Sequence, residues 1–128
     1  MKTDRELLEL AAKAACIDAG WHCPADEIEY QADNLAKSEG MWLKGSRSPD
    51  NSRYWNPLID DGDAFRLAVK LGMEIYSDAA AAPCGSAYAR VVGTGDDYVF
   101  EPIVSDAYAA TRRAIVRAAA AISDGMAA

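Results

Sequence analysis

The segment from Ser105 to Ser123 is rich in alanine, and its spacing restricts the fold more than any other part of the chain. One face of the predicted helix consists mainly of small side chains at three- and four-residue steps: Ala107, Thr111, Ala114, Ala118 and Ile122. Because alanine is short, such a helix can approach a sheet closely. Ser105 follows Pro102 at the start of the pattern and is the predicted N-cap. The chain is therefore expected to contain a late helix that packs on a sheet.

Two other segments have the spacing of amphipathic helices. In Thr3–Ala19, Thr3 and Glu6 stand in capping-box register, and an apolar stripe follows them: Leu7, Leu10, Ala11, Ala14 and Ile17. In Asp60–Gly72, an aspartate begins the helix, a glycine ends it, and the predicted buried face has the same spacing: Ala64, Leu67, Ala68 and Leu71. Acidic residues occupy the first turn of both helices, where the helix dipole favours negative charge.

Short strands are predicted between these helices. Two of them flank a loop rich in turn residues: Met41–Lys44 and Arg53–Trp55. Three more follow the second helix: Met73–Ser77, Ala87–Val92 and Tyr98–Glu101. The five-residue turn 93–97 between the last two indicates an antiparallel hairpin.

Length and charge limit the kinds of protein that this chain can be. The 128 residues are enough for one domain, residues 1–128, with a core of its own. A net charge of −7 argues against DNA, RNA or an anionic membrane as the partner. No apolar run approaches the ~18 residues that a membrane helix needs, and the charged first residues predict no signal peptide. The three cysteines are expected to be reduced thiols in a cytosol.

The stretch from Trp55 to Asp63 has three carboxylates within four positions: Asp60, Asp61 and Asp63. Their spacing does not match a calcium-binding loop. Asp60 or Asp61 is therefore expected to cap the following helix, and Asp63 to gain only from the helix dipole. Pro57 is expected to hold Asn56 in an extended conformation, and Trp55 to fill the core. A structural motif is the favoured interpretation, with acid/base or metal chemistry as the alternative.

The single histidine, His22, and the three cysteines are the residue types of a zinc site, but their spacing is not that of one. Cys16 is expected to be a small buried residue of the first helix. No sequence signal places His22 near Cys84, so a nucleophilic pair has little support. The sequence therefore assigns no catalytic residue, no metal ligand and no cofactor.

Three arginines cluster on the last predicted helix: Arg112, Arg113 and Arg117. Arg113 and Arg117 are one turn apart and share a face. One interpretation of the three arginines is a solvated helix face, on which they pair with acids such as Asp106 or those of the first helix. The alternative is a surface that binds nucleic acid or an acidic partner. The acidic composition favours the solvated face.

Residues 55–72, with the sequence WNPLIDDGDAFRLAVKLG, resemble the phage ABA-sandwich domain of short phage and prophage proteins. Leu7–Ala15 and Arg112–Ala120 match the same family. The resemblance implies an α+β fold, a three-layer α/β/α sandwich with a mainly antiparallel sheet and helices on both faces. It also implies a phage or prophage origin and a place in the host bacterial cytoplasm. It brings no activity, cofactor or catalytic residue.

The segment Cys23–Ser52 has no counterpart in this resemblance. Within it, Pro24–Lys37 is predicted as a helix, and a strand at Glu27–Gln31 is the alternative. Whether this segment has a specific function stays open at this point.

The leading hypothesis is a small non-enzymatic accessory protein that binds another protein, from the phage or from the host. A second hypothesis is a small metal-dependent or acid/base hydrolase that uses the cluster Asp60, Asp61 and Asp63, joined by His22. A third is a weak nucleic-acid binder that uses the arginines of the last helix.

Overall fold

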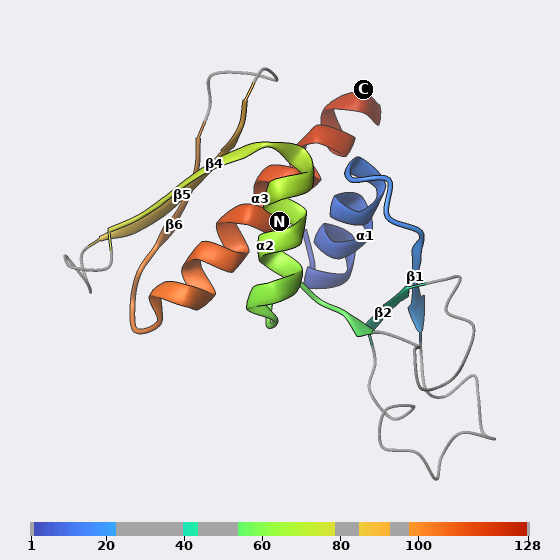
Figure 1. Ribbon diagram of the computed structural model, residues 1–128, viewed down its shortest axis with the longest axis horizontal. Coiled ribbons are helices and arrows are strands. Elements are labelled where there is room, and N and C mark those ends of the chain that lie inside the picture. The colour runs from blue at the N-terminus through green and yellow to red at the C-terminus, as the bar shows by residue number, and fades with distance from the viewer. Residues whose placement is uncertain (1, 23–39, 44–53, 79–84, 93–97, 128) are drawn as a thin grey trace, which may run out of the picture.

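The computed structural model describes residues 2–22, 40–43, 54–78, 85–92 and 98–127 (Figure 1). Its helices are α1 (Asp4–Ala14), α2 (Asp61–Leu71) and α3 (Ala107–Ala127). All strand pairs among the described residues are antiparallel, so the α+β class with antiparallel pairing is confirmed. The helix predicted at Pro24–Lys37, its strand alternative at Glu27–Gln31 and the turn 93–97 lie outside the described residues.

Within the part of the chain that the structure describes, the strands form two three-stranded sheets rather than one. The first sheet pairs β1 (Ala19–His22) with β2 (Gly40–Leu43), and β2 with β3 (Tyr54–Trp55). The second pairs β4 (Met73–Ser77) with β5 (Ser86–Val91), and β5 with β6 (Val99–Pro102). Helix α3 contacts the second sheet and also α1, which contacts β1 and β2. The helices therefore lie between the two sheets (Figure 1).

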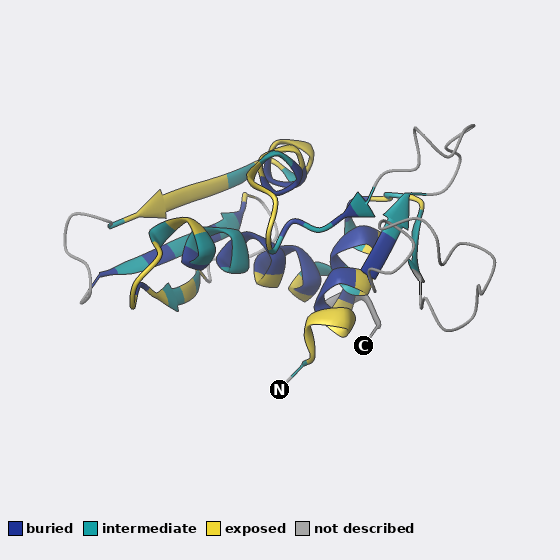
Figure 2. Ribbon diagram, turned by 90° about the horizontal axis from the view of Figure 1, so that it is seen from below, coloured by how far each residue is buried: buried dark blue, intermediate teal, exposed yellow. Residues whose placement is uncertain are grey.

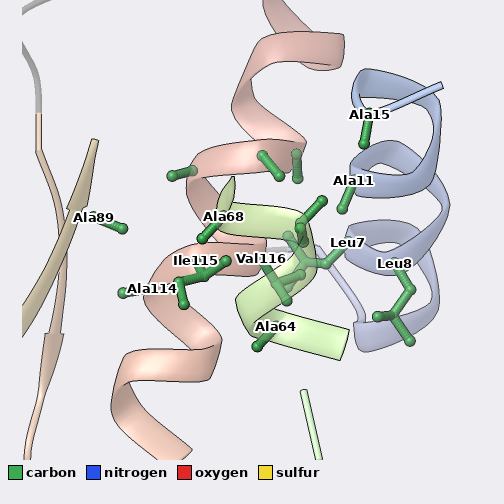
Figure 3. Packing of buried hydrophobic residues seen from close by; sticks show 14 of the residues in the cluster. Leu7, Leu8, Ala11, Ala15, Ala64, Ala68, Ala89, Ala114, Ile115 and Val116 are labelled. Atoms are coloured by element: carbon green, nitrogen blue, oxygen red, sulfur yellow. The ribbon is translucent and has the colours of Figure 1, made fainter. Parts of the chain in front are cut away.

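Helix α3 is the central element of the core. Its buried residues face α1, α2 and the second sheet, and most of them are small or branched: Ala110, Ala114, Ile115, Val116, Ala118, Ala119 and Ala120. On the sheet, Ala87 and Ala89 are fully buried, and Figure 3 shows Ala89 directed toward α3. Short side chains on both surfaces let helix and sheet approach closely. The close packing expected from the alanine spacing is confirmed.

The first helix ends earlier than its apolar stripe predicts. α1 stops at Ala14, and Cys16 then adopts a left-handed conformation with a φ of 55° before the chain enters β1. Ile17 lies beyond the end of the helix but still packs against the core. This packing explains why an apolar residue continues the helical spacing at that position. The expectation that Cys16 is a buried helix residue is wrong, since its side chain is exposed.

The cap of the last helix also differs from the prediction. The carboxylate of Asp106, not the hydroxyl of Ser105, accepts hydrogen bonds from the backbone N–H groups of Tyr108 (2.9 Å) and Ala109 (3.3 Å). Aspartate and serine are about equally good caps, so the sequence alone could not rank these neighbours. The other predicted strands and helices that fall within the described residues agree with the structure to within a few residues at each end.

A glycine joins α2 directly to the second sheet. Gly72 ends the helix in the left-handed region with a φ of 64°, a conformation that glycine adopts without a side-chain penalty. Strand β4 begins at the next residue, Met73. None of the helices in the described ranges is long and apolar enough to cross a lipid bilayer.

Candidate interaction surface

The motif from Trp55 to Asp63 forms the connection between β3 and α2. Trp55 is only 4% exposed and belongs to the core. The Oδ1 atom of Asn56 accepts a hydrogen bond from the backbone N–H of Leu58 at 3.0 Å, which makes an Asx-type turn around Pro57. These contacts support the structural interpretation of the motif.

Two of the three aspartates hold the start of α2 in place. The Oδ1 atom of Asp60 accepts from the backbone N–H of Gly62 at 2.9 Å, so Asp60 is the N-cap. Asp61 pairs instead with Arg112 of α3, with 2.6 Å between Oδ1 and Nη1. Arg112 also donates from Nε to the carbonyl oxygen of Leu58 at 2.8 Å. Arg112 thus connects this motif to the central helix.

Asp63 is the buried member of the cluster, at 5% exposure. One of its carboxylate oxygens accepts from the backbone N–H of Asn56 at 2.9 Å, and the other accepts from Arg66 at 2.8 Å. The expectation that Asp63 stabilises the helix only through the helix dipole is therefore wrong, since its carboxylate also accepts these two hydrogen bonds. The three carboxylates have three different sets of partners, and in the described part of the chain no three His, Cys, Asp or Glu side chains are grouped to hold a metal ion.

The arginines of α3 divide between two places. Arg113 pairs with Asp4 of α1 (3.1 Å) and with Glu101 of β6 (3.2 Å), and Arg117 pairs with the same Glu101 (3.3 Å). Both line a hollow of about 470 Å³ between α1, α3 and β6. Since Arg112 contacts the start of α2, the three side chains do not form one basic patch. Carboxylates of the chain compensate the charge of all three.

Of the histidine and the three cysteines, the structure describes only His22 and Cys16. His22 ends β1 opposite Gly40, and Cys16 follows α1 as a free, exposed thiol. Cys23 and Cys84 lie outside the described residues, so the Cys84–His22 pair is not tested.

The second sheet has a group of aromatic side chains that is not among the residues indicated by the sequence motifs. Tyr76, Tyr88 and Phe100 are directly opposite one another in β4, β5 and β6, and Tyr98 lies beside them. The rings of Tyr76 and Tyr88 stack at 5.5 Å with 11° between their planes. Phe100 meets Tyr88 edge-on at 4.8 Å and 74°. We call these four residues the aromatic face.

The aromatic face is turned away from the core. Alternate residues of β5, Ala87 and Ala89, point to the other side of the sheet and are fully buried. By contrast, Tyr76 is 58% exposed, Phe100 55% and Tyr98 41%, and Figure 2 shows β4 exposed along most of its length. Exposed apolar patches of contiguous residues on a small protein commonly mark interaction sites.

One ion pair lies on the same face of the sheet. Arg90 pairs with Glu74 at 2.9 Å, and its guanidinium lies 4.9 Å from the centroid of the Tyr98 ring. The hydroxyl of Tyr98 donates to Glu74 at 3.1 Å. The hydrogen bond from Arg90, and then that from Tyr98, holds the pKa of Glu74 below its ordinary value. The Glu74 carboxylate is therefore charged at neutral pH, and its pairing with Arg90 is lost as the pH falls through the lowered pKa.

This arrangement predicts an unusual titration of Glu74. In an NMR pH titration, its pKa is expected below the ordinary range for glutamate. Arg90→Met should raise the pKa toward the ordinary value more than Tyr98→Phe does, because Arg90 supplies both a hydrogen bond and a positive charge. Tyr76→Phe, which leaves both donors in place, serves as the control. An ordinary pKa for Glu74 in the unaltered protein would contradict this assignment.

Comparisons of the chain with protein-family models, with curated proteins and with solved structures found no match.

Proposed function

We propose that this protein is a small non-enzymatic phage or prophage accessory protein that binds a protein of the phage or the host through the aromatic face. The observation that supports binding is the exposure of Tyr76, Tyr98 and Phe100 on one continuous sheet surface. Aromatic residues are enriched in protein–protein interfaces because they bury a large area and lose little conformational entropy. The phage origin and the location in the host bacterial cytoplasm rest on the resemblance described above.

The three-layer α/β/α arrangement belongs to the same proposal. Helix α3 contacts the second sheet through its buried face, and the aromatic face is on the opposite side. The proposal of helices on both faces of a sheet rests on the resemblance described above.

The hydrolase and nucleic-acid hypotheses have less support. The carboxylates of Asp60, Asp61 and Asp63 are engaged with separate partners rather than directed at one point. The arginines of α3 are paired with carboxylates, and the whole chain has a net charge of −7. The phosphate groups of a nucleic acid would have to replace these carboxylates as partners of the arginines. The negative net charge of the chain would repel the phosphates at the same time.

A capture experiment with matched variants tests this function. The tagged protein is incubated with lysate of a strain that contains the prophage, and bound proteins are quantified by mass spectrometry. We expect one protein to be enriched by the unaltered chain and at least about tenfold less by the Tyr76→Ser/Phe100→Ser double variant.

The control is the Phe65→Ser/Tyr108→Ser double variant. It removes side chains that are 68% and 71% exposed but lie on α2 and α3. Capture should be unchanged in this variant. Enrichment that does not depend on the aromatic face, or no enriched protein at all, would contradict the proposed function.

A further inference from the structure

We infer that β4 pairs with β4 of a second copy of this chain, so that the second sheets of two molecules form one continuous antiparallel sheet. The surface involved is the outer edge of β4 rather than the aromatic face, so the proposed function is not a premise. Three observations support the pairing: the direction of the backbone hydrogen bonds in β4, the contrast with the opposite edge of the sheet, and the symmetry of the resulting strand pair.

The backbone of β4 is paired with β5 on one side, and the hydrogen bonds at its two ends show which residues are used. The N–H of Asp78 donates to the carbonyl oxygen of Ser86 at 3.1 Å, and the N–H of Val92 donates to that of Gly72 at 3.5 Å. Antiparallel strands exchange hydrogen bonds at every second residue pair. Even-numbered residues of β4 therefore direct their backbone groups at β5, and the odd-numbered ones direct theirs outward: Met73, Ile75 and Ser77.

The outward backbone groups have no hydrogen-bond partner in the part of the chain that the structure describes. Ile75 is 40% exposed, and Figure 2 shows most of β4 exposed. Proteins commonly protect an edge strand with proline, lysine or a bulge. β4 contains none of these, and its one charged side chain, Glu74, is paired with Arg90 of the neighbouring strand. An unprotected edge of this kind is a template for another strand.

The opposite edge of the same sheet, formed by β6, is largely closed. The N–H of Ile103 donates to the carbonyl oxygen of Gly85 at 2.9 Å, so the same alternation directs the backbone groups of Phe100 and Pro102 outward. Pro102 has no N–H to donate, and the carbonyl oxygen of Phe100 accepts from Nη1 of Arg117 at 3.0 Å. Pairing of β4 with β6 of another copy is therefore disfavoured, and the sheet has one open edge.

A twofold axis at Ile75 satisfies all the outward groups of β4. In this antiparallel register Ile75 lies opposite Ile75 of the second copy, and Met73 lies opposite Ser77, so each outward residue exchanges hydrogen bonds with the residue that it faces. Glu74 then lies opposite Tyr76, so no like charges are opposed. The two α2 helices, which precede β4, lie at opposite ends of the strand pair. Because the pairing uses the open edge of both copies, assembly ends at a dimer.

The dimer is expected to be weak and to depend on salt. Two paired strands of five residues form a small interface. Each chain has a net charge of −7, so two copies repel each other, and salt screens this repulsion. Dimerisation should therefore strengthen when the salt concentration is raised from about 20 to about 200 mM. Binding of a basic partner would weaken under the same change.

Sedimentation velocity of the full chain at about 5–500 μM tests this pairing. We expect a monomer–dimer equilibrium without larger species. Ile75→Pro removes an outward N–H and leaves the bonds to β5 in place, at a position where an edge strand tolerates proline. It should weaken dimerisation at least about tenfold. Ile75→Val is the matched control, since it retains both backbone groups and the branched side chain, and it should change dimerisation less than about twofold. Circular dichroism verifies that both variants are folded.

Amide hydrogen exchange followed by NMR is a second test, and it needs no variant. The N–H of Tyr76 is directed at β5, whereas the N–H of Ile75 is directed outward. At about 1 mM protein, the Ile75 amide should exchange at least about tenfold more slowly than an unpaired amide. Dilution should speed the exchange of Ile75 and leave that of Tyr76 unchanged.

The contrary results are distinct. A monomer at all these concentrations, growth into larger species, or a dimer that Ile75→Pro does not weaken would overturn the inference. So would an Ile75 amide that exchanges like an unpaired one at the higher concentration. If the chain is monomeric and Ile75→Pro abolishes capture from lysate while Ile75→Val does not, an extended segment of the partner occupies this edge instead of a second copy. Failure of the dimer leaves the proposed function standing, because capture by Tyr76→Ser/Phe100→Ser tests that function separately.

Discussion

Replacing Trp55 with alanine is expected to lower the free energy of unfolding by about 3–5 kcal/mol. The indole is 4% exposed and is part of the continuous core. Its removal leaves a cavity that the surrounding side chains fill only in part, so the loss exceeds the transfer energy of the ring. Since domains of this size are stable by about 5–15 kcal/mol, the change is a large share of the total.

Urea denaturation followed by circular dichroism measures this loss. Trp21→Ala is the matched control, because Trp21 is only half-buried at the edge of the core. The control should lose clearly less stability than Trp55→Ala. An equal or smaller loss for Trp55→Ala would show that Trp55 is not a core residue and would reopen its role as a ligand-binding side chain.

Asp63→Ala is expected to cost about 2 kcal/mol, the second largest effect among these variants. The substitution leaves the backbone N–H of Asn56 without its acceptor and removes the partner of Arg66. Asp63→Asn retains an acceptor oxygen and should cost less. Asp60→Ala removes only the exposed N-cap bond to Gly62 and should cost about 1 kcal/mol.

The same denaturation measurements decide between structure and chemistry for this cluster. Acidic residues that are held together for catalysis or metal binding store repulsion, so neutralising one of them stabilises the protein. A gain in stability for separate Asn variants of Asp60, Asp61 and Asp63 would contradict the structural account. A larger loss of stability for Asp63→Ala than for Asp60→Ala would support the structural account.

The parts of the fold that the sequence predicts well are those that local chemistry determines. The cap Asp60, the left-handed Gly72 and the alternating strands after it depend on near neighbours in the chain. Strand β1, Ala19–His22, could not be predicted in the same way, because its extended conformation comes from pairing with β2, beyond residue 39. The apolar spacing at Ile17 instead suggested that the first helix continued.

The candidate surface was only partly accessible to sequence reasoning. The alternation of Ala87, Tyr88 and Ala89 is visible in the sequence and indicates a strand with two different faces. The stacking of Tyr88 with Tyr76 and its contact with Phe100 depend on the register of three strands, which the sequence does not specify. The burial of Asp63 likewise depends on how the chain folds back at Asn56, and that is a tertiary property.

The packing of α1 on α3 has a consequence for synthesis of the chain. The hydroxyl of Ser123 in α3 bonds to the carbonyl oxygen of Leu10 in α1, a separation of 113 residues. The buried face of α1, which includes Leu7 and Leu8, therefore lacks its cover by α3 until α3 has been synthesised. At ~5–20 residues per second, synthesis of the 113 residues from Leu10 to Ser123 takes about 6–23 s. Completion of this part of the core therefore waits for α3, and until then the buried face of α1 lacks its main packing partner.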